Sequence, residues 1–289
     1  MERLEILKTY KIYIGGQFPR TESGRYYDPK NSKGEPLANI CLSSRKDLRN
    51  AVVAARKAFG GWSERAAFNR GQILYRIAEM LEGRRAQFVE ELIKQGSTKA
   101  NAEKEVNDSV DLIVHYSGWA DKYQQIFSSV NPVASSHFNF SALEPMGVVG
   151  VIAPQNTSLI GVVSSILPII TGGNTVLVLA SEKLPLCAVT FAEVLHSSDV
   201  PGGVVNILTG KESELLEHFG SHMDINAVFY AGNEEKNYFK LQELGTENLK
   251  RIRKYDPNNL ENPNLIADFQ EVKTTWHPIE NIGGSTSTY

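Results

Sequence analysis

The sequence predicts an α/β fold in which helices cover both faces of a parallel β-sheet. Four runs rich in valine, isoleucine and leucine lie at 147–153, 173–180, 203–210 and 225–232, separated by segments with helical patterning. The runs are nearly continuous and do not alternate apolar with polar residues, which indicates strands buried on both faces. Parallel strands joined by crossover helices account for both observations.

The composition is that of an ordinary globular protein and excludes several classes of function. Of the 289 residues, 42% are hydrophobic and 22% are charged, which is enough apolar material for a large core. A net charge of -3 gives no basic surface for nucleic acid or anionic membranes. The longest apolar run, 159–170, is interrupted by polar residues and is too short to cross a bilayer. We therefore expect no nucleic-acid partner and no membrane partner.

A cytoplasmic location is expected from two further features. The N-terminal residues alternate charged with apolar side chains and lack the apolar region of a signal peptide. The two cysteines, Cys41 and Cys187, lie far apart in unrelated patterns, which suits a reducing compartment.

The elements before the sheet can be assigned in chain order. Residues 11–43 are expected to form short strands and turns, with a Gly-Gly pair in a tight hairpin. Over 45–123 apolar residues recur at helical spacing, with breaks at Gly83 and Gly96. The last of these helices is expected over 102–123.

The composition changes after the sheet. Segment 257–267 is polar and rich in turn-forming residues, so it is expected to be a linker. A strand is expected over 269–279, and the Gly/Ser/Thr-rich tail that follows is expected to lack structure. A hairpin is expected around 135–143.

Several ordered motifs resemble the cofactor-binding domain of the aldehyde dehydrogenase superfamily. They are YIGGQF at 13–18, GWADK at 118–122, EPMGVVGVIAPQN at 144–156, GGNTVLVLASEKLPL at 172–186 and VPGGVVNILTG at 200–210. The resemblance spans nearly all of residues 11–255, and several motifs in order are more specific than a lone glycine-rich loop. It implies a Rossmann-like parallel sheet with helices on both faces, plus a small β-flap of the oligomerisation type.

The resemblance also implies a division of the chain. The expected parts are a discontinuous NAD-binding-like domain at 1–130 and 145–256, a β-flap at 131–144 and 268–280, a linker at 257–267 in place of the family's catalytic domain, and a tail at 281–289.

Carried over position by position, the family's cofactor groups are only partly kept. The oxyanion-binding asparagine falls on Asn156, for which the alternative is a loop residue that caps a helix starting near Thr157. The family's ribose-gripping lysine falls on Leu179, so its charge is missing. The vestigial cofactor-binding set implied by the resemblance is Ile152, Ala153, Pro154, Asn156, Ser181, Glu182, Gly210, Gly232 and Asn233.

The family's phosphate-binding helix terminus is also changed. Its Phe-Thr-Gly-Ser turn falls on 230–233, and Glu234 and Glu235 follow. We expect Asn233 to cap the helix and the two carboxylates to occupy its first turn, where the helix dipole favours negative charge. The same carboxylates would repel a pyrophosphate. No cofactor is expected, or NAD bound weakly at most.

The catalytic groups implied by the family are missing. No Gly-Gln-x-Cys loop is present, and Cys41 and Cys187 are expected to be core residues. Counting from NLKRI at 248–252 places the family's general base on Tyr255, which titrates too high to act as a carboxylate base. Glu243, in a similar ELG segment, is expected to lie on a helix. The six histidines show no metal-ligand spacing, so no catalytic residue and no metal site are expected.

Three hypotheses remain from the sequence. The leading one is a pseudoenzyme, because the chain resembles the non-catalytic second half of the family 16 tandem aldehyde dehydrogenases. Such a chain would associate through its flap as a homodimer, or with a catalytic aldehyde dehydrogenase subunit or tandem domain. The alternative is the cofactor-domain part of an NAD-dependent aldehyde dehydrogenase whose cysteine lies outside this chain. A nucleotide sensor without chemistry is the third.

Overall fold

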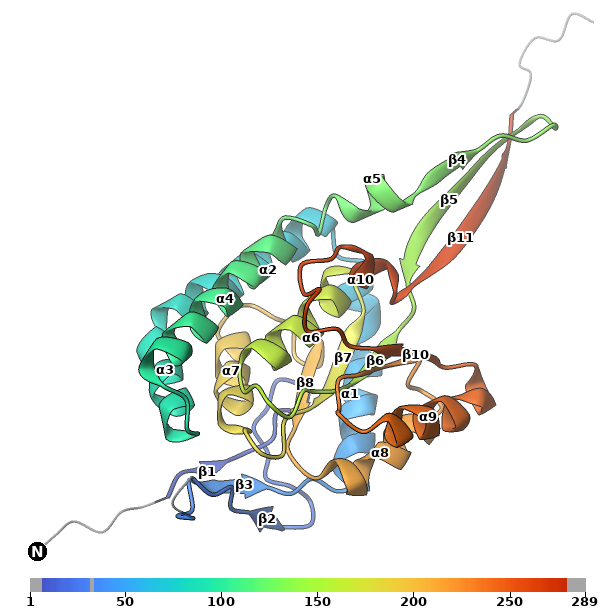
Figure 1. The fold of residues 1–289 in the computed structure, drawn as a ribbon. Coiled ribbons are helices and arrows are strands. Elements are labelled where there is room, and N and C mark those ends of the chain that lie inside the picture. The colour runs from blue at the N-terminus through green and yellow to red at the C-terminus, as the bar shows by residue number, and fades with distance from the viewer. Residues whose placement is uncertain (1–6, 32–33, 280–289) are drawn as a thin grey trace, which may run out of the picture.

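The centre of the protein is a five-stranded, fully parallel β-sheet (Figure 1). The structure is a computed structural model that describes residues 7–31 and 34–279. The strand order is β10 (Arg251–Lys254), β9 (Ala227–Tyr230), β6 (Val148–Ile152), β7 (Thr175–Leu179) and β8 (Val205–Leu208). The predicted parallel sheet is confirmed. The edge strand β10 was identified in the sequence only as part of a family-like segment.

Helices cover both faces of this sheet, as the sequence predicts. On one face Val149 and Val151 pack in a core with α6 (Ile160–Thr171) and α7 (Leu186–His196). On the other face Val148 and Ile152 pack in a second core. The first core extends into α2 (Ala67–Gly83), α3 (Arg85–Lys94) and α4 (Lys99–Ser117), whereas the second contains residues of α1 (Arg45–Ser63), α8 (Glu212–Ser221) and α9 (Glu235–Leu244).

The N-terminal residues form the expected short strands and turns. A small sheet has the order β1 (Thr9–Tyr10), β3 (Asn39–Cys41) and β2 (Tyr26–Tyr27). Gly15 and Gly16 form the predicted hairpin turn, with φ angles of 60° and 81° that side chains rarely adopt. The buried Glu91 accepts hydrogen bonds of 2.7 Å from the hydroxyls of Tyr10 and Thr190, and so joins this sheet to α3 and α7.

A β-flap projects from the body as a long arm (Figure 1). The short helix α5 (Tyr123–Phe127) leads into β4 (Ser129–Asn131), which pairs with β5 (His137–Pro145). The strand β11 (Gln270–Pro278) is antiparallel to β5 along its whole length. The two segments that were assigned to the flap therefore lie side by side. In the described part of the chain, the outer edge of β11 has no partner strand.

One expectation about element boundaries is wrong. The helix expected over 102–123 is α4, which begins at Lys99 and ends at Ser117, and the separate helix α5 follows. The segment 257–267, which is expected to be a linker, contains the short helix α10 (Asn264–Ala267) with a buried Ile266. Its turn is held to α4 by the Tyr116 hydroxyl, which donates 2.8 Å to the carbonyl of Leu260. Scattered apolar residues anchor this otherwise polar segment.

The expectations for the two chain ends concern residues that the structure does not describe. The tail 281–289 and the first six residues lie outside the described residues. Within the described ranges, no helix has the length and hydropathy needed to cross a bilayer.

The root of the flap provides the first testable prediction. Phe269, directly before β11, is fully buried and packs edge-on against Phe229, with ring centroids 5.3 Å apart. Phe269→Ala should lower the free energy of unfolding by about 3–5 kcal/mol, because it leaves a cavity that the core cannot close. Phe239→Ala is the control, because Phe239 is 59% exposed. Urea unfolding measures both, and equal midpoints for the two variants would show that this anchor is not part of the core.

Candidate cofactor site

The candidate site lies at the carboxyl edge of the sheet. From β6 the chain proceeds outward to β7 and β8 in one direction and later to β9 and β10 in the other, so the strand order reverses between β6 and β9. Ligands of open α/β sheets bind at such a reversal, outside the carboxyl ends of the strands. Three of the predicted residues, Ile152, Ala153 and Pro154, are buried at the end of β6. Gly232 and Asn233 follow β9 on the other side of the reversal.

The loops after β6 and β7 are tied together by Gln155. Its Nε2 donates 3.1 Å to the carbonyl of Ala153, and its Oε1 accepts the backbone N–H of Glu182 at 2.9 Å. The predicted residue Ser181 is buried, and its hydroxyl accepts the N–H of Leu184 at 3.0 Å. The predicted residues Ser181 and Glu182 are thus brought next to the β6 loop. Sequence reasoning missed Gln155, which directly precedes the candidate residue Asn156 in the loop after β6.

A buried apolar side chain stands at the position that the resemblance gives to the ribose-gripping lysine. Leu179 is 1% exposed and belongs to the core between the sheet and α1. The predicted residue Gly210 is also buried, and lies at the end of β8 against the backbone of Ser43. Among the described residues, Gly210 forms no hydrogen bond with the predicted residues that lie between β6 and β9.

The N-terminus of α6 carries a carboxylate from another helix. Glu105 of α4 accepts, with its Oε1 atom, the backbone N–H groups of Ser158, Leu159 and Ile160 at 3.3, 2.8 and 3.1 Å. These are the donors that a helix start leaves without partners. The interpretation of Asn156 as a cap for a helix starting near Thr157 is wrong, because α6 begins at Ile160 and Glu105 satisfies its first turn.

A polar cavity of about 230 Å³ lies beside this helix start. Asn156 is exposed at its rim, and its side chain makes no hydrogen bond with the described residues. The cavity is lined by Leu92, Gln95, Gly96, Ser97, Glu105, Asn156, Thr157, Ser158 and Leu184. The only charged group in this lining is the carboxylate of Glu105, so the cavity has the wrong sign for an anion.

The turn after β9 is filled by the side chain of Tyr230. A Cβ atom on Gly232 would lie 2.4 Å from the Tyr230 hydroxyl, so only glycine fits there. The hydroxyl lies 2.9 Å from Oε1 of Glu212 and 3.1 Å from the carbonyl of Glu234. Burial, together with the nearby Glu212, raises the pKa of Tyr230. The turn thus holds a phenol and a carboxylate close to the start of α9.

The expected cap of α9 is wrong in position. Asn233 lies outside the helix and is exposed, whereas Glu234 is the N-cap residue and Glu235 the only acid in the first turn. The turn continues one residue further than expected, because the Tyr230 hydroxyl binds the carbonyl of Glu234. Glu212 adds a second carboxylate here, since it accepts 2.8 Å from the side-chain amide of Asn237.

Of the side chains considered as catalytic groups, the two cysteines are buried, Tyr255 is half-buried and Glu243 is exposed. The hydroxyl of Tyr255 lies 2.7 Å from that of Ser164 on α6, and burial raises its pKa. Cys187 is fully buried in α7, where burial raises the pKa of its thiol well above the usual value. Cys41 is buried in β3 and Glu243 lies in the last turn of α9. Within the described residues, no group of three or more potential ligands could hold a metal ion.

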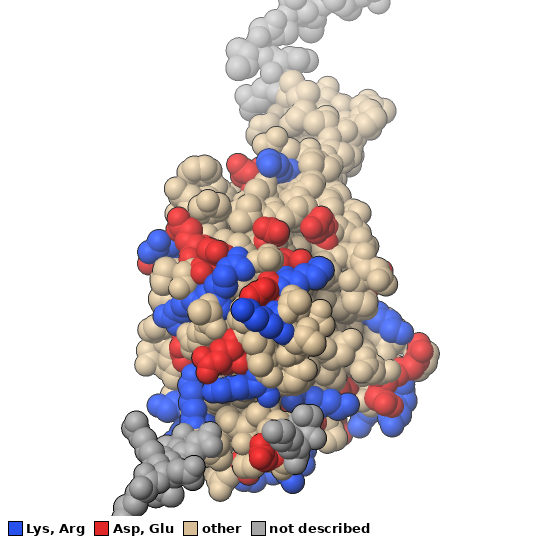
Figure 2. Space-filling view, turned by 60° about the vertical axis from the view of Figure 1, so that its left-hand side comes forward, with Lys and Arg blue, Asp and Glu red and all other residues tan. Residues whose placement is uncertain are grey.

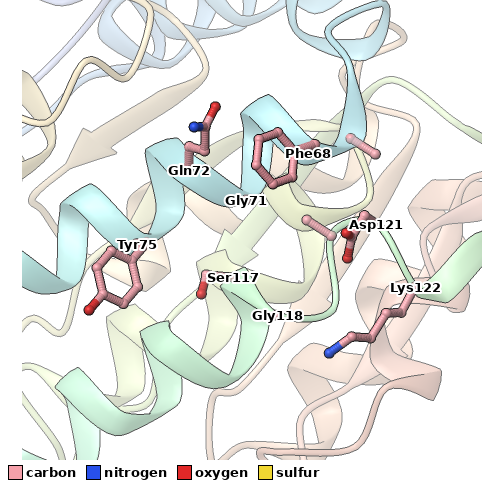
Figure 3. Close-up of a pocket in the computed structure, with 10 residues that line it drawn as sticks. Phe68, Gly71, Gln72, Tyr75, Ser117, Gly118, Asp121 and Lys122 are labelled. Atoms are coloured by element: carbon pink, nitrogen blue, oxygen red, sulfur yellow. The ribbon is translucent and has the colours of Figure 1, made fainter.

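A larger pocket lies elsewhere, between α2 and the end of α4 (Figure 3). Its volume is about 490 Å³, and the rings of Phe68 and Tyr75 on α2 stand on its open side with 67% and 52% exposure. Asp121 and Lys122 border it after α4, so both signs of charge are present. None of its lining residues belongs to the strand-end loops.

The sheet order and its carboxyl-edge loops define a Rossmann-like α/β domain, and the comparisons identify its family. The sequence profile of the aldehyde dehydrogenase family matches residues 19–253, and the chain belongs to this family. Retinal dehydrogenase 2 of Gallus gallus is 33% identical over 255 residues, which cover 86% of this chain and 48% of the relative. Cytosolic 10-formyltetrahydrofolate dehydrogenase of Xenopus laevis is 29% identical over 249 residues, which cover 84% of this chain and 28% of the relative.

Solved structures show the same partial coverage. The NAD+ complex of an aldehyde dehydrogenase from Bacillus cereus superposes with a TM-score of 0.81 at 25% identity, over 86% of this chain and 50% of that protein. A structure from Burkholderia cenocepacia, described as a putative aldehyde dehydrogenase, gives a TM-score of 0.81 at 27% identity. The chain thus spans half or less of the length of the relatives compared here.

The carboxylate at the start of α6 provides the second prediction. Glu105→Ala should lower the free energy of unfolding by about 1–3 kcal/mol, because buried N–H groups lose their charged acceptor. Glu103→Ala is a matched control, since Glu103 lies on the same helix and forms only an exposed pair with Lys99. Thermal unfolding of both variants measures the difference. A loss no larger for Glu105→Ala than for Glu103→Ala would contradict the assigned role.

Proposed function

We propose that this chain is a non-catalytic member of the aldehyde dehydrogenase family with a role in subunit association in the cytoplasm. One observation carries the proposal: both cysteines are buried, Cys187 completely and Cys41 with 3% exposure. The chemistry implied by the family needs a thiolate that an aldehyde can reach. Neither sulfur offers one, so this chain by itself has no nucleophile for the reaction.

The position of the general base supports the same proposal. A base in this reaction must exchange a proton near neutral pH. Tyr255 stands at the position that the family resemblance gives to the base, and its hydroxyl is engaged with Ser164. Because burial raises its pKa above the ordinary value, it is even less suited to accept a proton.

NAD, which the family implies, does not fit the residues at the carboxyl edge. A dinucleotide needs positive charge or free N–H groups for its phosphates. The start of α6 is taken by the carboxylate of Glu105, and the start of α9 lies beside Glu212 and Glu235. Leu179 offers no charge to a ribose or phosphate. The expectation of weak NAD binding at most is therefore part of the proposal.

A second function is favoured by one observation, the exposed amide of Asn156. Its side chain is exposed and makes no hydrogen bond within the described chain, so its amide could donate to the oxyanion of a bound aldehyde. The chain would then be the cofactor-domain part of an NAD-dependent aldehyde dehydrogenase. This function requires the phosphate region to accept NAD despite its carboxylates.

NAD binding separates the two functions. The purified chain should show no aldehyde-dependent formation of NADH, and calorimetry should give an NAD Kd weaker than about 1 mM. Glu212→Gln with Glu235→Gln should strengthen binding, because it removes two negative charges near the start of α9. Glu214→Gln with Glu217→Gln removes the same charge from exposed positions of α8 and serves as control. Tight NAD binding by the unaltered chain would favour the enzyme part.

The flap supports a role in association. Val272 and Trp276 are four positions apart on β11, so they lie on the same face of the strand, and they are 67% and 57% exposed. Val130 on β4 is 67% exposed. The open edge of β11 presents backbone groups that another strand can pair with. Large apolar side chains on a projecting arm are buried most readily against another subunit. A second copy of this chain or a catalytic aldehyde dehydrogenase is the proposed partner.

The association proposal gives a prediction for the apolar side chains of β11. Val272→Ser with Trp276→Ser should convert an associated species to a monomer with little change in thermal stability, since both side chains are mostly exposed. Phe239→Ser with Met223→Ser removes comparable exposed side chains outside the flap. Light scattering at micromolar concentration measures the mass. A monomeric unaltered chain that also fails to bind a catalytic aldehyde dehydrogenase would exclude the flap as an interface.

A further inference from the structure

A small basic cavity lies between α1 and α8, on the face of the sheet covered by these helices. Arg45 and Arg49 lie four positions apart on α1, so they stand on the same side of that helix. His218 comes from the last turn of α8, and His222 is the residue that follows this helix as its C-cap. The buried Leu48 lies between the two arginines at the wall, and the cavity measures about 150 Å³. None of these residues belongs to the candidate cofactor site.

The two arginines are not neutralised by the protein. Within the described chain, neither guanidinium makes an ion pair or hydrogen bond. The carboxylates nearby along the sequence are engaged elsewhere. Glu22 pairs with Lys46, and Asp47 accepts hydrogen bonds from Thr21 and Ser44. The guanidinium donors are therefore available to a ligand.

His222 offers a hydrogen-bond donor, and Lys250 adds positive charge near it. Nδ1 of His222 accepts the backbone N–H of Asp224 at 3.2 Å, so in the neutral ring Nε2 carries the hydrogen and is a donor. Burial lowers the pKa of His222, Asp224 acts in the opposite direction, and Lys250, Arg45 and Arg49 lower the pKa further. Three cationic side chains thus act on His222 against the carboxylate of Asp224.

We propose that this cavity binds a compact oxyanion of the phosphate class, held by the guanidinium groups of Arg45 and Arg49 and by the ring N–H groups of His218 and His222. Arginine forks match the geometry of phosphate oxygens, and a bound anion would relieve the repulsion between these groups. A volume of about 150 Å³ lies below the ~300–1,000 Å³ of typical organic-ligand sites, which selects a free anion or a single phosphate group over a dinucleotide. This site is independent of the proposed function.

Calorimetry and thermal unfolding with inorganic phosphate test the proposal on the full chain. Binding should raise the Tm of the unaltered protein, and Arg45→Gln with Arg49→Gln should weaken the Kd at least tenfold. Arg20→Gln with Lys57→Gln removes two exposed positive charges outside the cavity and should leave the Kd unchanged. No binding by the unaltered chain, or equal weakening in both variants, would overturn the proposal. His218→Gln, with a several-fold weaker Kd expected, provides a second variant.

The pH dependence of sulfate binding tests the electrostatic part of the proposal, since sulfate itself does not titrate between pH 6 and pH 8. The charged and titratable groups around the cavity are Arg45, Arg49, His218, His222, Asp224 and Lys250. Lys250 donates to the carbonyl of His222, and burial lowers its pKa to about 8, so its positive charge increases as the pH falls from 8 to 6. Sulfate should therefore bind more tightly at pH 6 than at pH 8, and equal affinity would contradict the electrostatic attraction assigned to this cavity.

A comparison of inorganic phosphate with AMP identifies the source of the anion. Tighter binding of inorganic phosphate assigns the site to the free anion, and tighter binding of AMP assigns it to a phosphate monoester. In either case Arg45→Gln with Arg49→Gln must weaken the interaction. Binding of AMP that survives this double change would place it elsewhere and remove the support for the cavity.

Discussion

The arrangement of the candidate site depends on the single carboxylate oxygen of Glu105 at the start of α6. Three backbone N–H groups at the helix start donate to this oxygen, and no other charged acceptor contacts them among the described residues. The contact fixes α4 against α6 and thereby sets the path of the loop. Gln155 then joins this loop to Glu182 after β7. The carboxyl edge of the sheet is held together by the chain's own side chains.

The start of α9 also has a carboxylate from another helix beside it. Glu212 lies in the first turn of α8, where the helix dipole favours a negative charge, and also accepts the Asn237 amide of α9. The Tyr230 hydroxyl completes the contact over Gly232. The two helix starts at the reversal of strand order therefore both have internal carboxylates. These carboxylates stabilise the helix starts by accepting hydrogen bonds, and their negative charge repels an anion at the same positions.

The sequence predicted most of the fold but only part of the site. The parallel sheet was predictable because its strands are apolar on both faces, and the flap because its segments match a family pattern. The starts of α6 and α9 were misplaced at Asn156 and Asn233, since a nearby polar residue is the usual cap. The real partner of α6 lies more than fifty residues upstream. A contact between residues so far apart in the chain cannot be predicted from a local sequence pattern. The burial of Ile266 in a polar segment could not be predicted for the same reason.

The glycine-rich turn before β7 shows how a cofactor-type motif can serve another purpose. Asn174 accepts the N–H of Gly147 at 2.9 Å and donates 2.8 Å to the carbonyl of Phe269, so it joins the two points where the flap strands meet the body. A Cβ atom on Gly172 would lie 2.3 Å from Nε2 of Gln270, which donates to the Gly172 carbonyl. The contact with Gln270 at the start of β11 is therefore what requires glycine at position 172. The orientation of the flap, and of any subunit bound to it, is thereby fixed relative to the sheet.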